Sequence, residues 1–259
     1  MLAACGKPHS EFVSIKKERI TPDQMALVAA GQSITCSDQE FCPEAIARMF
    51  AINFDDVNKS STCSAFLVAP DVVMTNSHCV YGLKMSLAKI CSGLYFSFPI
   101  NGFPLTAKCS EIIWRDARQH GRPNYKKGDN DFALIRLDRN IPVKPLKFNN
   151  VETKAGLKVF PVVVDQQGSF NARVTKLDCS VEKINPRYGV IQLGNCPVIS
   201  GNSGAPVLDE NQNVVAVIFA SSNNAVRKPQ DEIPLRIKST SKGFAYSIVH
   251  IQKMIGHLL

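Results

Sequence analysis

Short apolar runs, each bounded by glycine, proline, asparagine or aspartate, constrain the fold of this chain more than any other feature. Residues 63–68 and 72–75, for example, are separated by Pro70-Asp71. Short runs of this kind are typical of strands, and Pro-Asp between two of them is typical of a hairpin turn. The exception is the tail, 247–259, where apolar residues recur at the spacing of an amphipathic helix. We therefore predict an all-β protein with a C-terminal α-helix.

The chain contains nine cysteines, which is many for a protein of a reducing compartment. They lack the paired C-x-x-C spacing of a zinc site, so disulfides are favoured over metal binding. Spacing alone does not determine which cysteines pair. The candidates are Cys63 with Cys79, Cys91 with Cys109, Cys179 with Cys196, and Cys36 with Cys42.

The ninth cysteine lies in Leu2-Ala3-Ala4-Cys5, which resembles a bacterial lipobox, whose cysteine carries a lipid anchor. The charged and apolar segments that precede a lipobox are missing, which a sequence beginning inside a signal peptide would explain. A chance match of four residues is the alternative. Residues 1–43 are polar and are interpreted as a tether and lead-in. No stretch approaches the roughly 18 consecutive apolar residues of a membrane-spanning helix. We expect an extracytoplasmic protein that is secreted, periplasmic or anchored to a bacterial membrane surface through Cys5.

The net charge of +8 favours acidic partners, and nucleic acid is the usual candidate for a basic chain. The basic residues are scattered, with only short pairs such as Lys16-Lys17 and Lys126-Lys127, and no aromatic residues alternate with them. A solvated basic surface explains this pattern better, and we predict no nucleic-acid partner.

One serine stands between glycines in Gly201-Asn202-Ser203-Gly204. A serine hydroxyl becomes an effective nucleophile only when a base takes its proton and backbone N–H groups stabilise the oxyanion that forms on the substrate. Flanking glycines suit this chemistry because they allow positive φ and a close approach of the substrate carbonyl. The alternative is an ordinary turn between two strands. The catalytic interpretation therefore depends on whether the chain also supplies a base and an orienting acid.

A histidine and an aspartate in specific surroundings meet that requirement. His78 follows the predicted strand 72–75, and a bridge from Cys79 would hold its loop. Asp131 precedes the apolar run 132–137, so its carboxylate would lie at the mouth of a buried strand and could accept a ring N–H of a histidine. Asp129 is the competing acid, but its neighbours are typical of a solvated turn.

His78, Asp131 and Ser203 occur in the order found in chymotrypsin-like serine proteases, and their surroundings resemble that family's motifs. The motifs are Thr-Asn-Ser-His-Cys at 75–79, Asp-Phe-Ala-Leu-Ile at 131–135 and Gly-Asn-Ser-Gly-Ala-Pro at 201–206. The resemblance covers residues 44–259 and implies two packed six-stranded antiparallel β-barrels. Residues 44–145 would form the first barrel, and residues 146–259 the second barrel and the C-terminal helix.

The resemblance also implies a serine endopeptidase acting on protein or peptide substrates. Ser203 would attack the peptide carbonyl, His78 would transfer the proton to the leaving amine, and Asp131 would orient His78. The N–H groups of Gly201 and Ser203 would form the oxyanion hole, and the reaction needs no metal or cofactor. Two other functions stay open: a catalytically silent surface binding protein, and an esterase with the same triad.

Two positions depart from the animal digestive members of that family. Those enzymes carry an aspartate before the nucleophile, which pairs with an N-terminal amine released by cleavage, whereas this chain has Asn202 and no Arg/Lys-Ile-Val-Gly-Gly stretch. Asn202 is closer to the bacterial glutamyl-endopeptidase branch. Pro197 replaces the acid of trypsin-type specificity pockets, and Ile218 replaces the histidine of the glutamyl branch. We therefore expect an uncharged pocket for apolar or small side chains, lined by Pro197, Ile218, Ala220 and Ser221.

The proposed base generates a first prediction, on the pH dependence of catalysis. Because the histidine of such a triad must be neutral to accept a proton, we expect kcat/KM to fall as the pH drops below about 6 to 7. Peptide hydrolysis measured between about pH 4 and pH 9 tests this, and a profile that stays flat down to about pH 4 would contradict the role of His78.

Overall fold

The structure is a computed structural model that describes residues 33–36, 43–52, 61–80, 86–100, 103–116, 130–167, 171–222 and 241–258. Cys5, Cys42 and Asp129 lie outside these residues, as does the side chain of Cys36. The lipid anchor and the Cys36–Cys42 pairing therefore stay predictions. In the described segments, no helix has both the length and the apolar character needed to cross a membrane.

Six antiparallel strands close into the first barrel, in the order β2-β3-β4-β7-β6-β5. The predicted hairpin is present, because β3 and β4 pair across the turn at Pro70-Asp71. Alternate side chains of the strands fill the interior, where Met49, Phe96 and Ile135 are fully buried. The strands are β2 (Ile46–Ala51), β3 (Ser61–Ala69), β4 (Val72–Thr75), β5 (Leu94–Ile100), β6 (Phe103–Arg115) and β7 (Ala133–Leu137). Two short helices, η2 (Ser77–Val80) and α2 (Leu87–Ser92), lie between β4 and β5.

The second barrel is formed by strands β8 to β14, with β1 added at its edge. Pairing of β8 with β12 closes the ring β8-β10-β11-β14-β13-β12. The strands are β1 (Ser33–Cys36), β8 (Lys158–Gln167), β9 (Asn171–Lys176), β10 (Cys179–Asn185), β11 (Val190–Gly194), β12 (Pro206–Leu208), β13 (Val214–Ser221) and β14 (Gly243–Ser247). Together, the two closed six-stranded barrels confirm the predicted fold class.

Strands β9 and β10 behave as one strand of the second barrel. Both are antiparallel to β8, with Lys176 opposite Val162 and Cys179 opposite Val159. The interruption at residues 177–178 separates a half that extends the sheet toward β1 from a half that belongs to the ring.

Three disulfides connect neighbouring elements of the barrels. Cys63–Cys79 joins β3 to η2, Cys91–Cys109 joins α2 to β6, and Cys179–Cys196 joins β10 to the loop that leads to Ser203. These are pairs that the sequence favoured. By chain entropy, a cross-link that closes about 15 residues stabilises a fold by about 3 kcal/mol. Each bridge therefore stiffens a segment next to a predicted functional residue or within a barrel wall.

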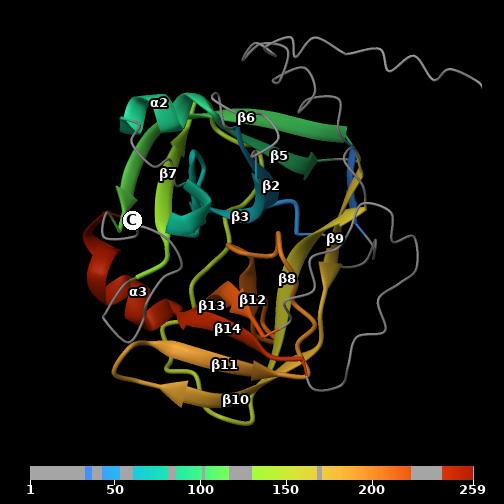
Figure 1. The fold of residues 1–259 in the computed structure, drawn as a ribbon, viewed down its shortest axis with the longest axis vertical. Coiled ribbons are helices and arrows are strands. Elements are labelled where there is room, and N and C mark those ends of the chain that lie inside the picture. The colour runs from blue at the N-terminus through green and yellow to red at the C-terminus, as the bar shows by residue number, and fades with distance from the viewer. Residues whose placement is uncertain are drawn as a thin grey trace, which may run out of the picture.

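The two barrels meet through one continuous apolar cluster. Phe66 and Phe132 of the first barrel, Tyr246 of the second and Ile251 of the C-terminal helix α3 (Ile248–Ile255) all belong to it and are fully buried. Helix α3 confirms the predicted amphipathic tail, and it lies at the side of the molecule where the barrels adjoin (Figure 1). This cluster fixes how the loops of one barrel face those of the other.

The cluster generates a prediction for stability. Ile251→Ala removes a fully buried side chain between helix and barrels, so we expect the free energy of unfolding to fall by about 2 to 5 kcal/mol. Lys253→Ala, on the exposed face of the same helix, is the matched control, with an expected change within about 0.5 kcal/mol. Urea denaturation of both variants measures the difference, and equal losses would contradict the packing of α3 described above.

Candidate active site

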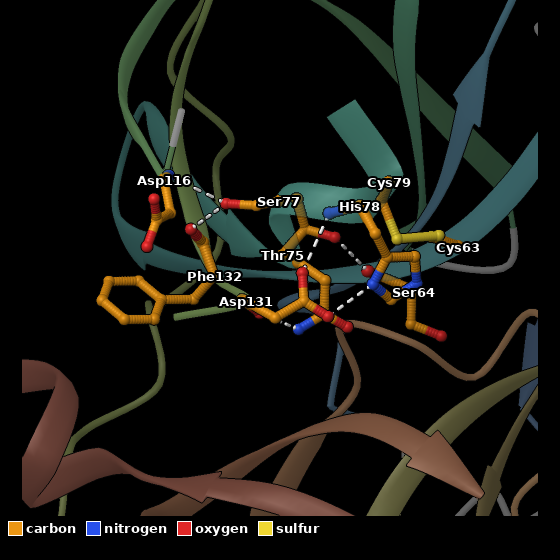
Figure 2. A network of polar contacts seen from close by, with 10 residues as sticks. Cys63, Ser64, Thr75, Ser77, His78, Cys79, Asp116, Asp131 and Phe132 are labelled. Carbon is orange, nitrogen blue, oxygen red and sulfur yellow. Dashed lines mark hydrogen bonds and ion pairs between the residues drawn. A yellow bond between two sulfur atoms is a disulfide. The ribbon is translucent and has the colours of Figure 1, made fainter. Parts of the chain in front are cut away.

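His78 and Asp131 meet because the strands next to them are neighbours. His78 follows β4, Asp131 precedes β7, and these strands pair antiparallel, with Thr75 opposite Ala133. The end of β4 therefore lies beside the start of β7. Asp131 Oδ2 lies 2.5 Å from Nδ1 of His78, and Oδ1 accepts a hydrogen bond of 2.9 Å from the backbone N–H of His78 (Figure 2).

The two side chains differ in their access to solvent. The carboxylate of Asp131 is fully buried, whereas 30% of the His78 side chain is exposed. With Nδ1 directed at Asp131, the other ring nitrogen, Nε2, is the one left to act on a substrate. Buried charge is costly unless it is hydrogen-bonded, and the two contacts to His78 meet that condition for Asp131. The pair can therefore work as an oriented base.

Side chains of the loop between β4 and His78 hold the segment that carries Asp131. Asn76 Nδ2 donates to the backbone carbonyl of Asp131 at 2.5 Å, and Ser77 Oγ donates to the carbonyl of Phe132 at 2.5 Å. All four residues are buried. Because unsatisfied buried carbonyls are costly, these bonds favour one position of Asp131 relative to His78.

Asp116 extends this network beyond the predicted site. Its backbone N–H donates to Ser77 Oγ at 3.1 Å (Figure 2), and its Oδ2 accepts from the N–H of Asn130 at 3.0 Å. It thus links the end of β6 to the residue before Asp131. Sequence reasoning missed Asp116, and the available signal was an acid directly after the end of the strand-like run 111–114 and Arg115. The competing acid, Asp129, lies outside the described residues.

Ser203 lies in a tight turn before β12 that glycines make possible. Gly201 has a φ of 94° and Gly204 a φ of 85°, a region that side-chain-bearing residues seldom adopt. A Cβ on Gly204 would overlap the carbonyl oxygen of Ser64 and Oγ1 of Thr75. The turn of the second barrel therefore packs directly against β3 and β4 of the first. Ser203 itself is partly exposed.

Asn202 closes this turn through its own amide. Its Oδ1 accepts from the N–H of Ile199 at 2.9 Å, and its Nδ2 donates to the carbonyl of Val164 at 3.4 Å. Its backbone N–H also donates to the carbonyl of Ile199 at 3.1 Å. With only 2% of its surface exposed, Asn202 holds the turn by local hydrogen bonds between neutral groups.

The four residues predicted to line a specificity pocket divide into two groups. Pro197, Ala220 and Ser221 are partly exposed. Ile218 is 1% exposed and belongs to the apolar core of the second barrel. Strand pairing sets Ser221 opposite Gly243. The pocket itself stays a prediction.

One group of described residues has the geometry of a metal site. A ring nitrogen of His78 and the sulfurs of Cys63 and Cys79 lie within 4.8 Å of one another. Both sulfurs are joined in a disulfide, however, and a metal needs the thiolate. We therefore assign no metal to this group.

Comparisons with known proteins bear on the family and the fold of this chain. The model of a family described as a trypsin-like peptidase domain matches residues 63–217, more than half of the chain. A search of curated protein sequences finds no significant match.

Solved structures with a similar fold include several proteases. A Glu endopeptidase in complex with MPD is 21% identical, with a TM-score of 0.58 over 83% of this chain and 90% of that chain. The active form of the Rv3671c protease from M. tuberculosis is 16% identical, with a TM-score of 0.55 over 87% and 89%. The serine endoprotease from Yersinia pestis is 13% identical, with a TM-score of 0.58 over 84% and 63%. At such identities the likeness shows a shared fold.

The packing of the turn that carries Ser203 generates a prediction for stability. Gly204→Ala combines a positive φ with an overlap against backbone, whereas Gly156→Ala has a similar φ of 86° and nothing within 4 Å of the new Cβ. We expect Gly156→Ala to lower the free energy of unfolding by about 1 to 2 kcal/mol, and Gly204→Ala by at least about 2 kcal/mol more. Chemical denaturation measures both, and equal losses would contradict the close approach of the turn to Ser64.

Proposed function

The chain belongs to the family of trypsin-like peptidase domains and is a serine-type endopeptidase, and we propose that Ser203 is its nucleophile, His78 its base and Asp131 its orienting acid. The observation that carries the proposal is the buried Asp131 carboxylate, which contacts both the ring and the backbone N–H of His78. A carboxylate in this position fixes one tautomer of the imidazole and stabilises the imidazolium that forms during proton transfer.

The proposed roles of Ser203, His78 and Asp131 define the steps of the reaction. Ser203 Oγ attacks the carbonyl carbon of the scissile peptide while Nε2 of His78 accepts the hydroxyl proton. The imidazolium then gives that proton to the leaving amine, and an acyl-enzyme forms. A water molecule, deprotonated by the same nitrogen, hydrolyses the acyl-enzyme and regenerates Ser203. The partial exposure of His78 and Ser203 supports this scheme, since both must reach a bound substrate.

The packing of the nucleophile turn supports an approach of Ser203 to His78. Gly204, next to Ser203, lies against Oγ1 of Thr75, which is three residues before His78. The two partners come from different barrels, and this contact brings their loops together.

An oxyanion hole formed by Gly201 and Ser203 is part of the proposal. Within the described residues, the backbone N–H groups of Gly201 and Ser203 have no acceptor, whereas those of Asn202 and Gly204 donate to the carbonyls of Ile199 and Ile218. Two preorganised N–H groups without acceptors would stabilise the negative charge that develops on the substrate oxygen.

For specificity, we propose protein or peptide substrates with apolar or small side chains at the cleaved bond. Pro197 and Ile218 carry no charge at the positions where related branches bind basic or glutamyl side chains. A charged substrate side chain would therefore lose its solvation without gaining a partner. Three disulfides also support an extracytoplasmic location, where such bridges persist.

A fluorophosphonate probe, which reacts with activated serines, tests the nucleophile. We expect the wild-type protein to label and Ser203→Ala not to label, because the attacking oxygen is gone. Ser92→Ala, an exposed serine on α2, is the matched control and should label at the wild-type rate. A folded wild-type protein with intact disulfides that does not label would overturn the proposal and favour a silent binding protein.

A peptide-library digest tests the reaction and the specificity together. We expect cleavage after apolar or small residues, and Asp131→Asn should lower kcat by up to about 10⁴-fold because the imidazole loses its oriented tautomer. A profile dominated by Arg, Lys or Glu would overturn the uncharged pocket. Hydrolysis of simple esters without cleavage of any peptide would identify an esterase instead.

A further inference from the structure

Ser64 lies in the wall of the first barrel, directly beneath the nucleophile turn of the second. It belongs to β3 and is fully buried. Its backbone N–H donates to the carbonyl of Ser203 at 2.8 Å, and its carbonyl accepts from Oγ1 of Thr75 at 2.8 Å. Figure 2 shows Ser64 beside Thr75. These contacts use the backbone, so a residue of another type could make them.

The hydroxyl of Ser64 makes two further contacts that need a serine side chain. Ser64 Oγ donates to the carbonyl of Gly201 at 3.4 Å, and it accepts from the N–H of Val164 in β8 at 3.3 Å. The carbonyl of Val164 in turn accepts from the amide of Asn202. A single buried hydroxyl thus connects the nucleophile turn to a strand of the second barrel from within the first.

Gly201 needs such an external restraint. It has a φ of 94° and no side chain of its own to hold it. The same residue supplies one of the N–H groups of the proposed oxyanion hole. A hydrogen bond to its carbonyl holds the peptide plane between Gly201 and Asn202, and so limits the backbone rotations of Gly201 that would turn its N–H away. Oxyanion donors act by being aimed in advance, so this restriction bears on the rate of the reaction.

We propose that the hydroxyl of Ser64 is a positioning residue that aims the Gly201 N–H and the Ser203 turn for catalysis, an inference that rests on the proposed role of Ser203. The hydroxyl does not touch the substrate. It acts through the Gly201 carbonyl, so its loss should affect the transition state more than the bound substrate.

A second buried serine of the first barrel, Ser97, serves as a comparison for Ser64. Ser97 in β5 is 1% exposed, and within the described residues its Oγ has no hydrogen-bond partner. It lies in the same barrel as Ser64 and is as deeply buried, but within the described residues its hydroxyl makes no hydrogen bond to the turn that carries Ser203. Ser97→Ala is therefore the matched control for a substitution at Ser64.

The test uses Ser64→Ala and Ser64→Gly, both of which remove the hydroxyl without adding volume to a buried site. Active sites are titrated with a fluorophosphonate, and kcat and KM are measured per titrated site on a peptide that the wild-type protein cleaves. We expect kcat to fall about 10- to 100-fold with KM within about threefold, because a small displacement of an oxyanion donor is costly. The affinity for a peptide boronic acid, which mimics the tetrahedral intermediate, should fall by a similar factor.

The outcomes separate the two proposals. A wild-type protein that neither labels nor cleaves would overturn the proposed function itself. If the wild-type protein is active, then a folded Ser64→Ala or Ser64→Gly protein with the kcat of Ser97→Ala overturns the positioning role. A rise in KM with unchanged kcat and boronate affinity also overturns it. Loss of kcat and boronate affinity in the Ser64 variants, with Ser97→Ala at the wild-type level, supports it.

Discussion

The apolar contact between the two barrels is the constraint on which everything else in this structure depends. Neither barrel holds all three residues of the proposed triad, because His78 and Asp131 lie on one barrel and Ser203 on the other. Phe66, Phe132 and Tyr246, from both barrels, are fully buried in one shared cluster, and burial of large apolar side chains contributes roughly 1.5 to 3 kcal/mol each. The hydrophobic effect therefore assembles the site, and polar contacts refine it.

The polar contacts that cross between the two barrels are specific because they are buried away from water. Ser64 is fully buried, and it bonds across the contact through its backbone N–H to the carbonyl of Ser203 and through its hydroxyl to Gly201 and Val164. Leaving a buried polar group without its partner costs more free energy than the hydrogen bond contributes. Other arrangements of the two barrels are therefore strongly disfavoured. Such a network specifies one geometry, which is what a reaction that needs oriented groups requires.

The strand pattern and the local motifs could be predicted from the sequence, because hairpins such as the one at Pro70-Asp71 and turns rich in glycine are encoded by adjacent residues. The roles of Ser64 and Asp116 could not. Ser64 contacts a residue 137 positions away, and Asp116 contacts residues 39 and 14 positions away. Such contacts depend on strand register, which shifts at irregularities such as that between Leu67 and Ala69. The spacing of residues along the chain does not reveal these long-range contacts.

The adjacency of Cys63 and Ser64 has a mechanical consequence. Cys63 is bonded covalently to Cys79, the residue after His78, while the next residue, Ser64, donates its backbone N–H to Ser203. The loop that carries His78 and the turn that carries Ser203 are therefore both attached to the same two residues of β3. The spacing between the loop of His78 and the turn of Ser203 therefore depends directly on a few bonds made by β3.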